Sequence, residues 1–368
     1  MPKPLPIGTQ TFRDIIDGGF LYVDKTQSIF EIIRHFKGVY FLSRPRRFGK
    51  SLFISTLAEI FKGHKELFRD LWLYTSDYTW PTHPVIRIDF SQERVYNAEG
   101  LTETIKVYLQ EIAANYGITL AEGPYDRQFR WLIQQLAIQG KVVILIDEYD
   151  KPIIDNLENT AEAKRIQEVL KNFYTVIKAM DEYLRFVFIT GISKFSRIGI
   201  FSGLNNLVDV SLNGRFATAL GLTEAEIVQN FQAYIADFAA KEGVPETELL
   251  AKIRYWYNGF CFAAEGEKVY NPFSTLLLFY HQRFANYWFE SGTPTFLIKL
   301  IKAKEFDIQQ FNEVKLREIS FSTYEIENLA IIPLLFQTGY LTIKGYEAET
   351  QLYTLAYPNY EVEEAFST

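Results

Sequence analysis

Cysteine and histidine are scarce in this chain of 368 residues. The single cysteine, Cys261, has no partner for an internal disulfide, a usage typical of proteins from a reducing compartment. Only four histidines occur, and none stand at the close spacing of a zinc site: His35, His64, His83 and His281. The sequence therefore argues against both a disulfide framework and a structural zinc ion.

Long hydrophobic segments are also absent. The longest apolar runs, such as residues 142–146 and 276–280, fall far short of the roughly 18 residues needed to cross a bilayer. The first six residues include three prolines and no continuous apolar stretch, so no targeting segment is visible. We therefore expect a soluble, cytoplasmic protein without a membrane partner.

Positive charge is not in excess. Lysine and arginine number 38 against 45 aspartates and glutamates, which gives a formal net charge of -7 at pH 7. This balance argues against a general polyanion-coating role but leaves room for a local basic patch. Hydrophobic residues make up 48% and charged residues 23%, close to ordinary globular usage, so a buried core is expected. At about 150 residues per domain, the length predicts two or three domains.

Short apolar runs alternate with amphipathic helical patterns between residues 38 and 212. The runs are rich in β-branched and aromatic residues, and the expected strands are residues 39–42, 85–88, 142–146, 186–189 and 207–212. Period-3.6 patterns between them predict helices over residues 50–62, 101–116 and 166–180. This alternation predicts an α/β fold, with a parallel sheet between helices, as a first domain over residues 1–215.

Two smaller parts are expected after this domain. In residues 216–285, Thr223-Glu224-Ala225-Glu226 is a capping box and Asn271-Pro272 a helix start, while no convincing strand alternation occurs. This segment is expected to be a helical lid subdomain. Residues 286–368 combine an apolar segment that ends at Gly339 with two alternating segments, 340–343 and 351–355. Helices followed by a β-hairpin predict a winged-helix-like module.

The strongest chemical signal lies between an expected strand and an expected helix, at Arg44-Pro45-Arg46-Arg47-Phe48-Gly49-Lys50-Ser51. Its last three residues match the phosphate loop G-x-x-x-x-G-K-[ST], or Walker A motif, but Arg44 stands where the first glycine belongs. Gly-Lys-Ser alone can arise by chance, and the position between strand and helix argues against that. The residues expected to bind a nucleotide are Arg44, Arg46, Arg47, Phe48, Gly49, Lys50, Ser51 and Leu52.

Each residue type in this loop suits a phosphate ligand. Gly49 lets the backbone approach a phosphate closely, Lys50 can reach the terminal phosphates, and the Ser51 hydroxyl can hold Mg²⁺. The arginine cluster could instead meet nucleic acid or a partner carboxylate. A nucleotide phosphate or a neighbouring acidic side chain is the favoured interpretation.

Two carboxylates, Asp147 and Glu148, end the apolar strand over residues 142–146, as in a Walker B motif. Open α/β sheets bind ligands at the carboxyl ends of their strands. Asp147 is expected to hold Mg²⁺, and Glu148 to polarise an attacking water. An acidic pair on a solvated rim is an equal alternative for this pair alone, but the phosphate loop earlier in the chain favours nucleotide binding.

The strand over residues 186–189 becomes polar where it ends. Thr190 or Ser193 could orient a water, and Lys194 or Arg197 could compensate developing charge. A loop with solvated basic residues is the alternative. The expected catalytic residues are therefore Glu148, Lys50 and Thr190.

Six segments, in order along the chain, resemble the AAA-ATPase-like family of bacterial proteins: residues 22–26, 44–51, 144–149, 201–206, 221–224 and 257–260. The resemblance implies a P-loop NTPase domain that binds ATP and Mg²⁺ through Gly49, Lys50, Ser51, Asp147 and Glu148. The resemblance also implies that arginine is the usual residue at position 44 in this family. Residues 22–26 either pack near the adenine or only join a strand to a helix.

The family often carries a PD-(D/E)XK nuclease-superfamily domain after the ATPase. This chain reaches Thr368 without the acidic strands of such a domain, so we do not expect it to cut DNA by that mechanism. The leading hypothesis is a Mg-dependent ATPase that acts as a nucleotide-driven switch for an attached or partner effector. The alternative is a non-hydrolysing nucleotide sensor that binds DNA or protein through its C-terminal module. A homo-oligomer is compatible with either.

Overall fold

A computed structural model describes residues 2–35, 37–193, 200, 201, 204, 206–288, 313–321 and 330–367. The roles expected for Lys194 and Arg197 lie outside these residues. Within the described part, no helix has both the length and the apolar character needed to cross a bilayer.

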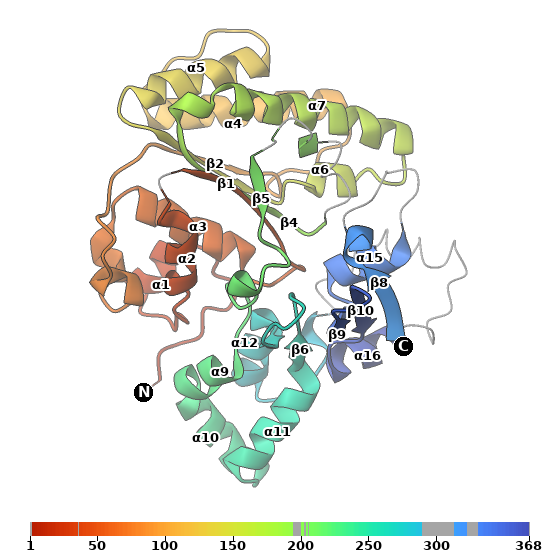
Figure 1. Cartoon of the computed structure of the whole chain (residues 1–368). Helices are drawn as coiled ribbons and strands as arrows, with labels where there is room; N and C mark the ends of the chain where they lie inside the picture. Colours follow the sequence, from red (N-terminus) through yellow and green to blue (C-terminus); the bar gives the residue numbers. More distant parts are fainter. Residues whose placement is uncertain are drawn as a thin grey trace.

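Five parallel strands form the main sheet, in the order β2-β3-β4-β1-β5 (Figure 1). Their bounds are β1 Gly38–Ser43, β2 Val85–Asp89, β3 Val142–Asp147, β4 Leu184–Gly191 and β5 Leu207–Asp209. All five expected strands are therefore confirmed, although β5 is shorter than expected. Because the strands are parallel, their carboxyl ends meet at one edge, where Ser43 pairs with Gly191 and Asp89 with Asp147.

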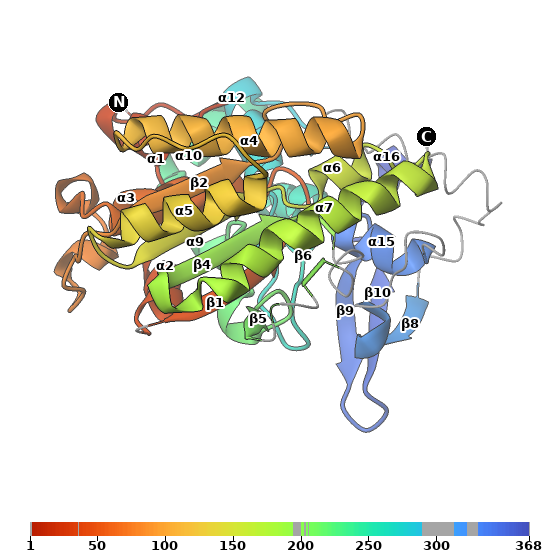
Figure 2. The same cartoon turned by 90° about the horizontal axis from the view of Figure 1, so that it is seen from above.

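Helices cover both faces of this sheet (Figure 2). Alternate side chains of β3 point to opposite faces. Those of Val142, Ile144 and Ile146 belong to the same core as α4 (Ala98–Asn115), α5 (Tyr125–Ala137) and α7 (Thr160–Ala179). Those of Val143 and Leu145 belong to the other core, with α1 (Phe12–Asp17), α2 (Thr26–Ile33) and α3 (Lys50–Phe61). Burial on both faces explains why the strand is apolar from Val142 to Ile146.

Shorter helices complete this part of the chain. The helix α6 covers Lys151–Ile154, and 3-10 helices cover Lys65–Phe68, Trp72–Thr75, Asp181–Tyr183 and Gly214–Phe216. The helix expected over residues 50–62 is confirmed as α3, and Gly63 after its end has a φ of 76°. Glycine adopts this left-handed conformation without steric cost, which suits the end of a helix.

The next part is mainly helical and contains α9 (Glu224–Asn230), α10 (Gln232–Glu242), α11 (Glu246–Tyr257) and α12 (Pro272–His281). The expected capping box is present, because Thr223 Oγ1 accepts from Glu226 N and Glu226 Oε2 accepts from Thr223 N. One correction is needed, since β6 (Asn258–Phe260) and β7 (Val269–Tyr270) pair antiparallel here. Strands this short show no readable alternation in sequence.

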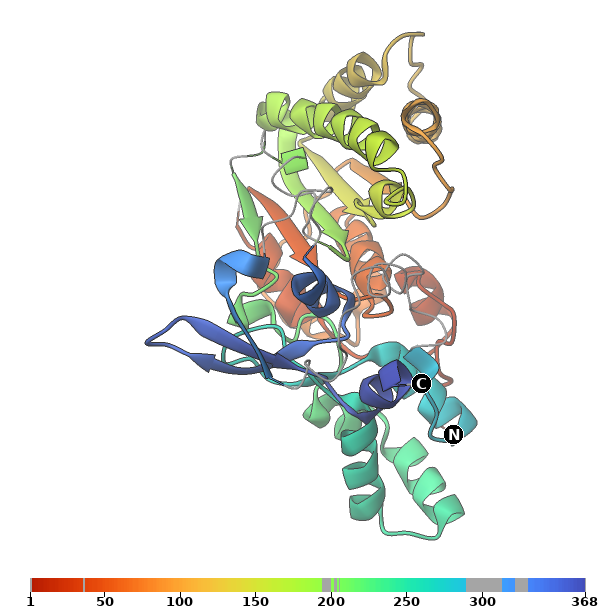
Figure 3. The same cartoon turned by 90° about the vertical axis from the view of Figure 1, so that its right-hand side faces the viewer.

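The C-terminal part contains a three-stranded antiparallel sheet in the order β8-β10-β9. Its elements are β8 Val314–Arg317, a 3-10 helix Glu318–Phe321, α15 Ile331–Thr338, β9 Thr342–Glu347, β10 Leu352–Ala356 and α16 Tyr360–Ser367. The expected hairpin is confirmed as β9 and β10, whereas β8 was not expected. Figure 3 shows this part beside both the main sheet and the helical part. The winged-helix assignment and the domain boundaries stay predictions.

Candidate functional site

The loop of residues 44–49 joins β1 to α3 at the carboxyl edge of the main sheet. Gly49 precedes α3 with φ 86° and ψ 18°, and a Cβ there would meet no described atom within 4 Å. Its left-handed backbone, rather than space, therefore favours glycine. No described side chain caps the N-terminus of α3. The N–H groups of its first turn have no partner within the helix, so this terminus is suited to binding an anion.

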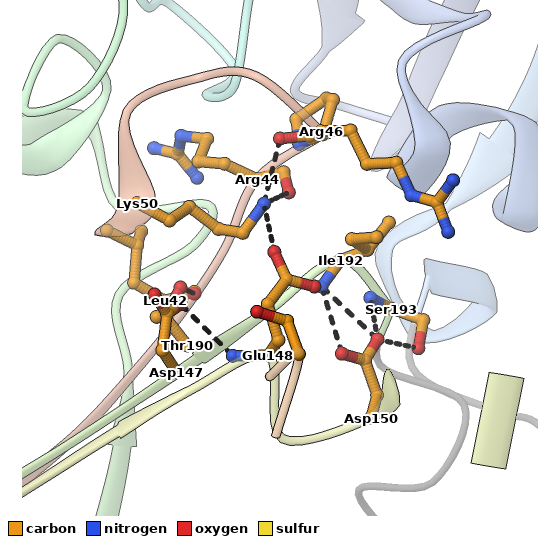
Figure 4. Close-up of polar contacts among 12 residues, drawn as sticks. Leu42, Arg44, Arg46, Lys50, Asp147, Glu148, Asp150, Thr190, Ile192 and Ser193 are labelled. Atoms are coloured by element: carbon orange, nitrogen blue, oxygen red, sulfur yellow. Dashed lines mark hydrogen bonds and ion pairs between the residues drawn. The ribbon is translucent and has the colours of Figure 1, made fainter. Parts of the chain in front are cut away.

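Lys50 joins the phosphate loop to the acidic end of β3 (Figure 4). Its side chain is almost fully buried, and Nζ donates to the carbonyls of Arg44 at 3.2 Å and Pro45 at 3.0 Å. The same Nζ lies 3.3 Å from Glu148 Oε1. The two motifs that the sequence analysis paired are therefore in direct contact through their charged groups.

Asp147 is fully buried at the end of β3, and its carboxylate is only partly satisfied. One oxygen, Oδ1, accepts from the Glu148 N–H at 3.0 Å, while Oδ2 has no hydrogen-bond partner among the described residues. Burial and then the Glu148 charge raise the pKa of Asp147 to about 6, while the Ser51 hydroxyl and Lys50 act in the opposite direction. A buried carboxylate oxygen without a partner, beside a serine hydroxyl, fits a hard divalent cation such as Mg²⁺.

The rest of such a cation's coordination would have to come from elsewhere. In the described ranges, no group of three or more histidine, cysteine, aspartate or glutamate side chains is placed to hold a metal ion. Mg²⁺ is commonly held by one or two protein groups together with substrate phosphates and water. Ser51 and Asp147 match that pattern.

The backbone of Glu148 is unusual. Its φ is 50°, a value uncommon for a residue with a side chain and often found at functional sites. The side chain keeps 17% of its area exposed, and its carboxylate contacts Lys50. The conformation thus leaves a partly solvated carboxylate at the sheet edge, directly after the buried Asp147.

A cavity of about 680 Å³ opens beside these groups. It falls within the usual size range of small-molecule sites. Most of the residues expected to bind nucleotide line it, together with Glu148: Arg46, Arg47, Gly49, Lys50, Ser51 and Leu52. Sequence analysis had not identified the other walls, which lie in four parts of the chain: Pro6, Gly8, Thr9 and Gln10; Ser91 and Arg94; Lys151, Ile154, Asp155 and Glu158; and Pro272, Phe273 and Leu276 of α12.

Arg44 lies elsewhere. It is 1% exposed, and its guanidinium donates to the carbonyls of Ser43, Ser211 and Phe216 at 2.8–3.0 Å. It also lies over the Phe262 ring, 4.2 Å from the ring centroid. Figure 4 shows the guanidinium pointing away from Glu148. The geometry therefore gives Arg44 the task of anchoring the loop, and does not support contact with a nucleotide.

Phe48 is also buried away from the large cavity, between the rings of Phe260 and Phe262. It lines a smaller, mostly apolar pocket of about 100 Å³ that shares Gly49 and Leu52 with the large cavity. Other walls of this pocket come from several parts of the chain and include Tyr22, Val23, Leu220, Leu222, Phe231 and Leu276. Of residues 22–26, Tyr22, Val23 and Lys25 line this pocket, and both alternatives for the segment stay open.

The polar end of β4 is bound to other parts of the protein. Thr190 Oγ1 donates to the Leu42 carbonyl at 2.7 Å, and both N and Oγ of Ser193 donate to Asp150 Oδ2 at 2.7 and 2.5 Å. Burial raises the pKa of Asp150 to about 6. Because both hydroxyls donate to protein acceptors, a catalytic role for Thr190 has no support from this geometry. Sequence analysis missed Asp150, although it follows Asp147 by three residues.

Comparison with known proteins identifies the family of this chain. The family model described as "Predicted AAA-ATPase" matches residues 6–201, which include the phosphate loop and the acidic strand end. The chain is also 41% identical over 367 residues to "Uncharacterized protein in vnfD 5'region" of Azotobacter chroococcum mcd 1, covering 98% of this chain and 68% of that protein. The chain belongs to the AAA-ATPase-like family.

Proposed function

We propose that the chain binds Mg-ATP in the large cavity and hydrolyses it. Membership of the family supports nucleotide binding. The observation that carries the proposal is the position of Lys50, whose buried ammonium group lies between the phosphate-loop carbonyls and Glu148 at the wall of the cavity. An ammonium group held there can exchange its protein acceptors for phosphate oxygens.

The phosphates would bind at the loop and the first turn of α3. The N–H groups there lack partners within the helix, and the helix dipole favours negative charge. Arg46 and Arg47 add positive charge at the cavity wall. Arg47 also lies over the Phe273 ring, 4.8 Å from its centroid, so its side chain reaches α12. A triphosphate would therefore meet N–H groups, Lys50 and two arginines, in a cavity whose walls also include Asp155 and Glu158.

Ser51 and Asp147 are the residues that would hold Mg²⁺. The ion, when bound, neutralises charge on the phosphate oxygens. Glu148 would act as the general base, because its partly exposed carboxylate can accept a proton from water at the sheet edge. Its ion pair with Lys50 would have to be exchanged for that water once Lys50 turns to the phosphates.

The base would lie in the smaller apolar pocket. The two cavities share walls at Pro6, Gly49, Leu52, Pro272 and Leu276, so the apolar pocket lies beside the proposed phosphate site. Its walls include residues 21–23, Lys25, residues 219–222 and Phe231. A mostly apolar pocket is a suitable environment for the faces of an adenine ring.

The test is phosphate release by wild type and Glu148→Gln with Mg-ATP. We expect turnover in wild type and its loss in the variant, which should still bind ATP because the amide keeps the shape of the side chain. Glu182→Gln, at an exposed glutamate, is the matched control and should leave turnover unchanged. Wild type that binds ATP without turnover would support the non-hydrolysing alternative, and unchanged turnover in Glu148→Gln would remove the base role.

A further inference from the structure

The phosphate loop is contacted from outside the nucleotide cavity by Trp288. We propose that Trp288 is a positioning residue for this loop and that the buried carboxyl group of Glu361 holds Trp288 in place, so that nucleotide binding and the packing of α16 depend on each other. This inference rests on the proposed nucleotide site and adds its regulation by the C-terminal part of the chain.

The first contact is direct. Trp288 is fully buried, and its Nε1–H donates to the Arg46 carbonyl at 3.2 Å. Its ring packs against Tyr340, with centroids 5.1 Å apart. Next to it, Gly339 has a φ of 92°, and a Cβ there would lie 2.8 Å from Pro45 and 3.1 Å from Trp288. The C-terminal part therefore lies so close to the loop that only glycine fits at position 339 without a shift.

This contact sets the orientation of the peptide between Arg46 and Arg47, two residues that line the large cavity. A trans peptide is planar, and its carbonyl and N–H point in opposite directions. Because the Arg46 carbonyl points to Trp288, the Arg47 N–H of the same peptide points away from it. Arg47 and Gly49 both have positive φ, in a loop of the kind whose successive N–H groups surround an anion. Without the indole N–H, this peptide loses the partner that sets its orientation.

Glu361 connects Trp288 to two further elements. Its side chain lies on α16, is fully buried, and accepts from the Trp288 backbone N–H at 2.8 Å through Oε1. Both of its oxygens lie 3.0 Å from Ser274 Oγ on α12, the helix that supplies Phe273 and Leu276 to the cavity. A single carboxyl group thus joins α16, Trp288 and a wall of the nucleotide site.

If the position of Trp288 affects nucleotide binding, nucleotide binding must affect the position of Trp288. If Trp288 sets the loop for phosphate binding, then phosphate binding must favour the bound position of Trp288 by the same free energy. The indole is also a fluorophore whose emission responds to its surroundings. Trp288 is therefore the proposed positioning residue, and its fluorescence can also report nucleotide binding.

The experiment is a fluorescence titration of the full chain with Mg-ATP, paired with calorimetric Kd values. Wild type should change its emission on binding, and Trp288→Phe should lose that change. The phenylalanine keeps an aromatic ring but lacks the N–H, so we expect about fivefold weaker binding, the equivalent of one hydrogen bond of about 1 kcal/mol. Trp131→Phe, at an exposed tryptophan of α5, is the control and should match wild type in both measurements.

A second pair of variants separates positioning from general stability. Glu361→Gln keeps an acceptor and should bind like wild type, whereas Glu361→Ala should weaken binding when measured at a temperature where it is folded. If Glu361→Ala does not fold, Trp288→Phe alone decides. The inference would be overturned if Trp288→Phe bound Mg-ATP with the same Kd as wild type and the emission of wild type did not change on binding. Absence of any binding by wild type would instead overturn the proposed nucleotide site.

Discussion

Replacing Arg44 with methionine should destabilise the fold much more than it weakens nucleotide binding. Arg44 occupies the first-glycine position of the phosphate loop, yet its guanidinium donates to the carbonyls of Ser43, Ser211 and Phe216. Burial lowers the pKa of Arg44 to about 9, so the group is still charged at neutral pH. Methionine would fill part of the space and leave these carbonyls without their donor.

The expected loss of stability in Arg44→Met follows from these contacts. A hydrogen bond from a charged donor contributes about 1.5–3 kcal/mol, but removing the guanidinium also removes the cost of burying its charge. We expect a net loss of about 3 kcal/mol in the free energy of unfolding. At about 2–4 °C per kcal/mol for a domain of this size, Tm should fall by roughly 6–12 °C.

The assay is urea and thermal unfolding followed by circular dichroism, with Kd for Mg-ATP measured below the transition. Arg69→Met, at an arginine that is 70% exposed, is the control and should cost less than about 0.5 kcal/mol. A loss below about 1 kcal/mol in Arg44→Met, accompanied by more than tenfold weaker ATP binding, would refute the anchoring role. Such a result would instead place Arg44 at the phosphates, as the sequence alone suggested.

Two other predictions concern buried groups away from the phosphates. Burial raises the pKa of Glu361 from its ordinary 4.5 to about 8, so the folded state holds this proton more tightly than the unfolded state. The stabilisation of the folded state by protonated Glu361 is therefore complete below about pH 4.5, and it is lost as the pH rises through about 8. Between these limits, urea titrations should show that the free energy of unfolding of wild type falls by up to about 1.4 kcal/mol per pH unit relative to that of Glu361→Gln. Parallel plots of this free energy against pH for the two proteins would contradict the prediction. Tyr257 faces the same carboxyl group but should not titrate in this range, because burial raises its pKa. In the apolar pocket, Leu222→Trp should weaken ATP binding and leave tripolyphosphate binding unchanged; equal losses for both ligands would exclude this pocket as the base site.

The sequence predicted the main sheet and the proximity of the phosphate loop to the acidic end of β3, because both features have local sequence signatures. Five apolar runs gave five strands, and the strand that ends at Asp147 is apolar because both of its faces are buried. The Gly49-Lys50-Ser51 sequence placed a helix start after β1, and parallel strands bring such ends to one edge. These inferences need only neighbouring residues and the geometry of a parallel sheet.

What the sequence could not show depends on distant contacts. The direction of the Arg44 side chain is set by carbonyls at residues 211 and 216, and the Trp288 contact joins the loop to a residue far along the chain. Asp150 likewise accepts hydrogen bonds from Ser193, which lies 43 residues further along the chain. No periodicity or motif within one segment encodes such pairs.

The most direct test of the proposed nucleotide site is calorimetric titration of wild type and Lys50→Ala with Mg-ATP. Loss of a charged donor to phosphate should weaken binding at least tenfold, since such a bond contributes about 1.5–3 kcal/mol. Lys178→Ala, at an exposed lysine near the end of α7, should bind like wild type. Equal affinity in wild type and Lys50→Ala, or no binding by wild type, would contradict a triphosphate site at the phosphate loop.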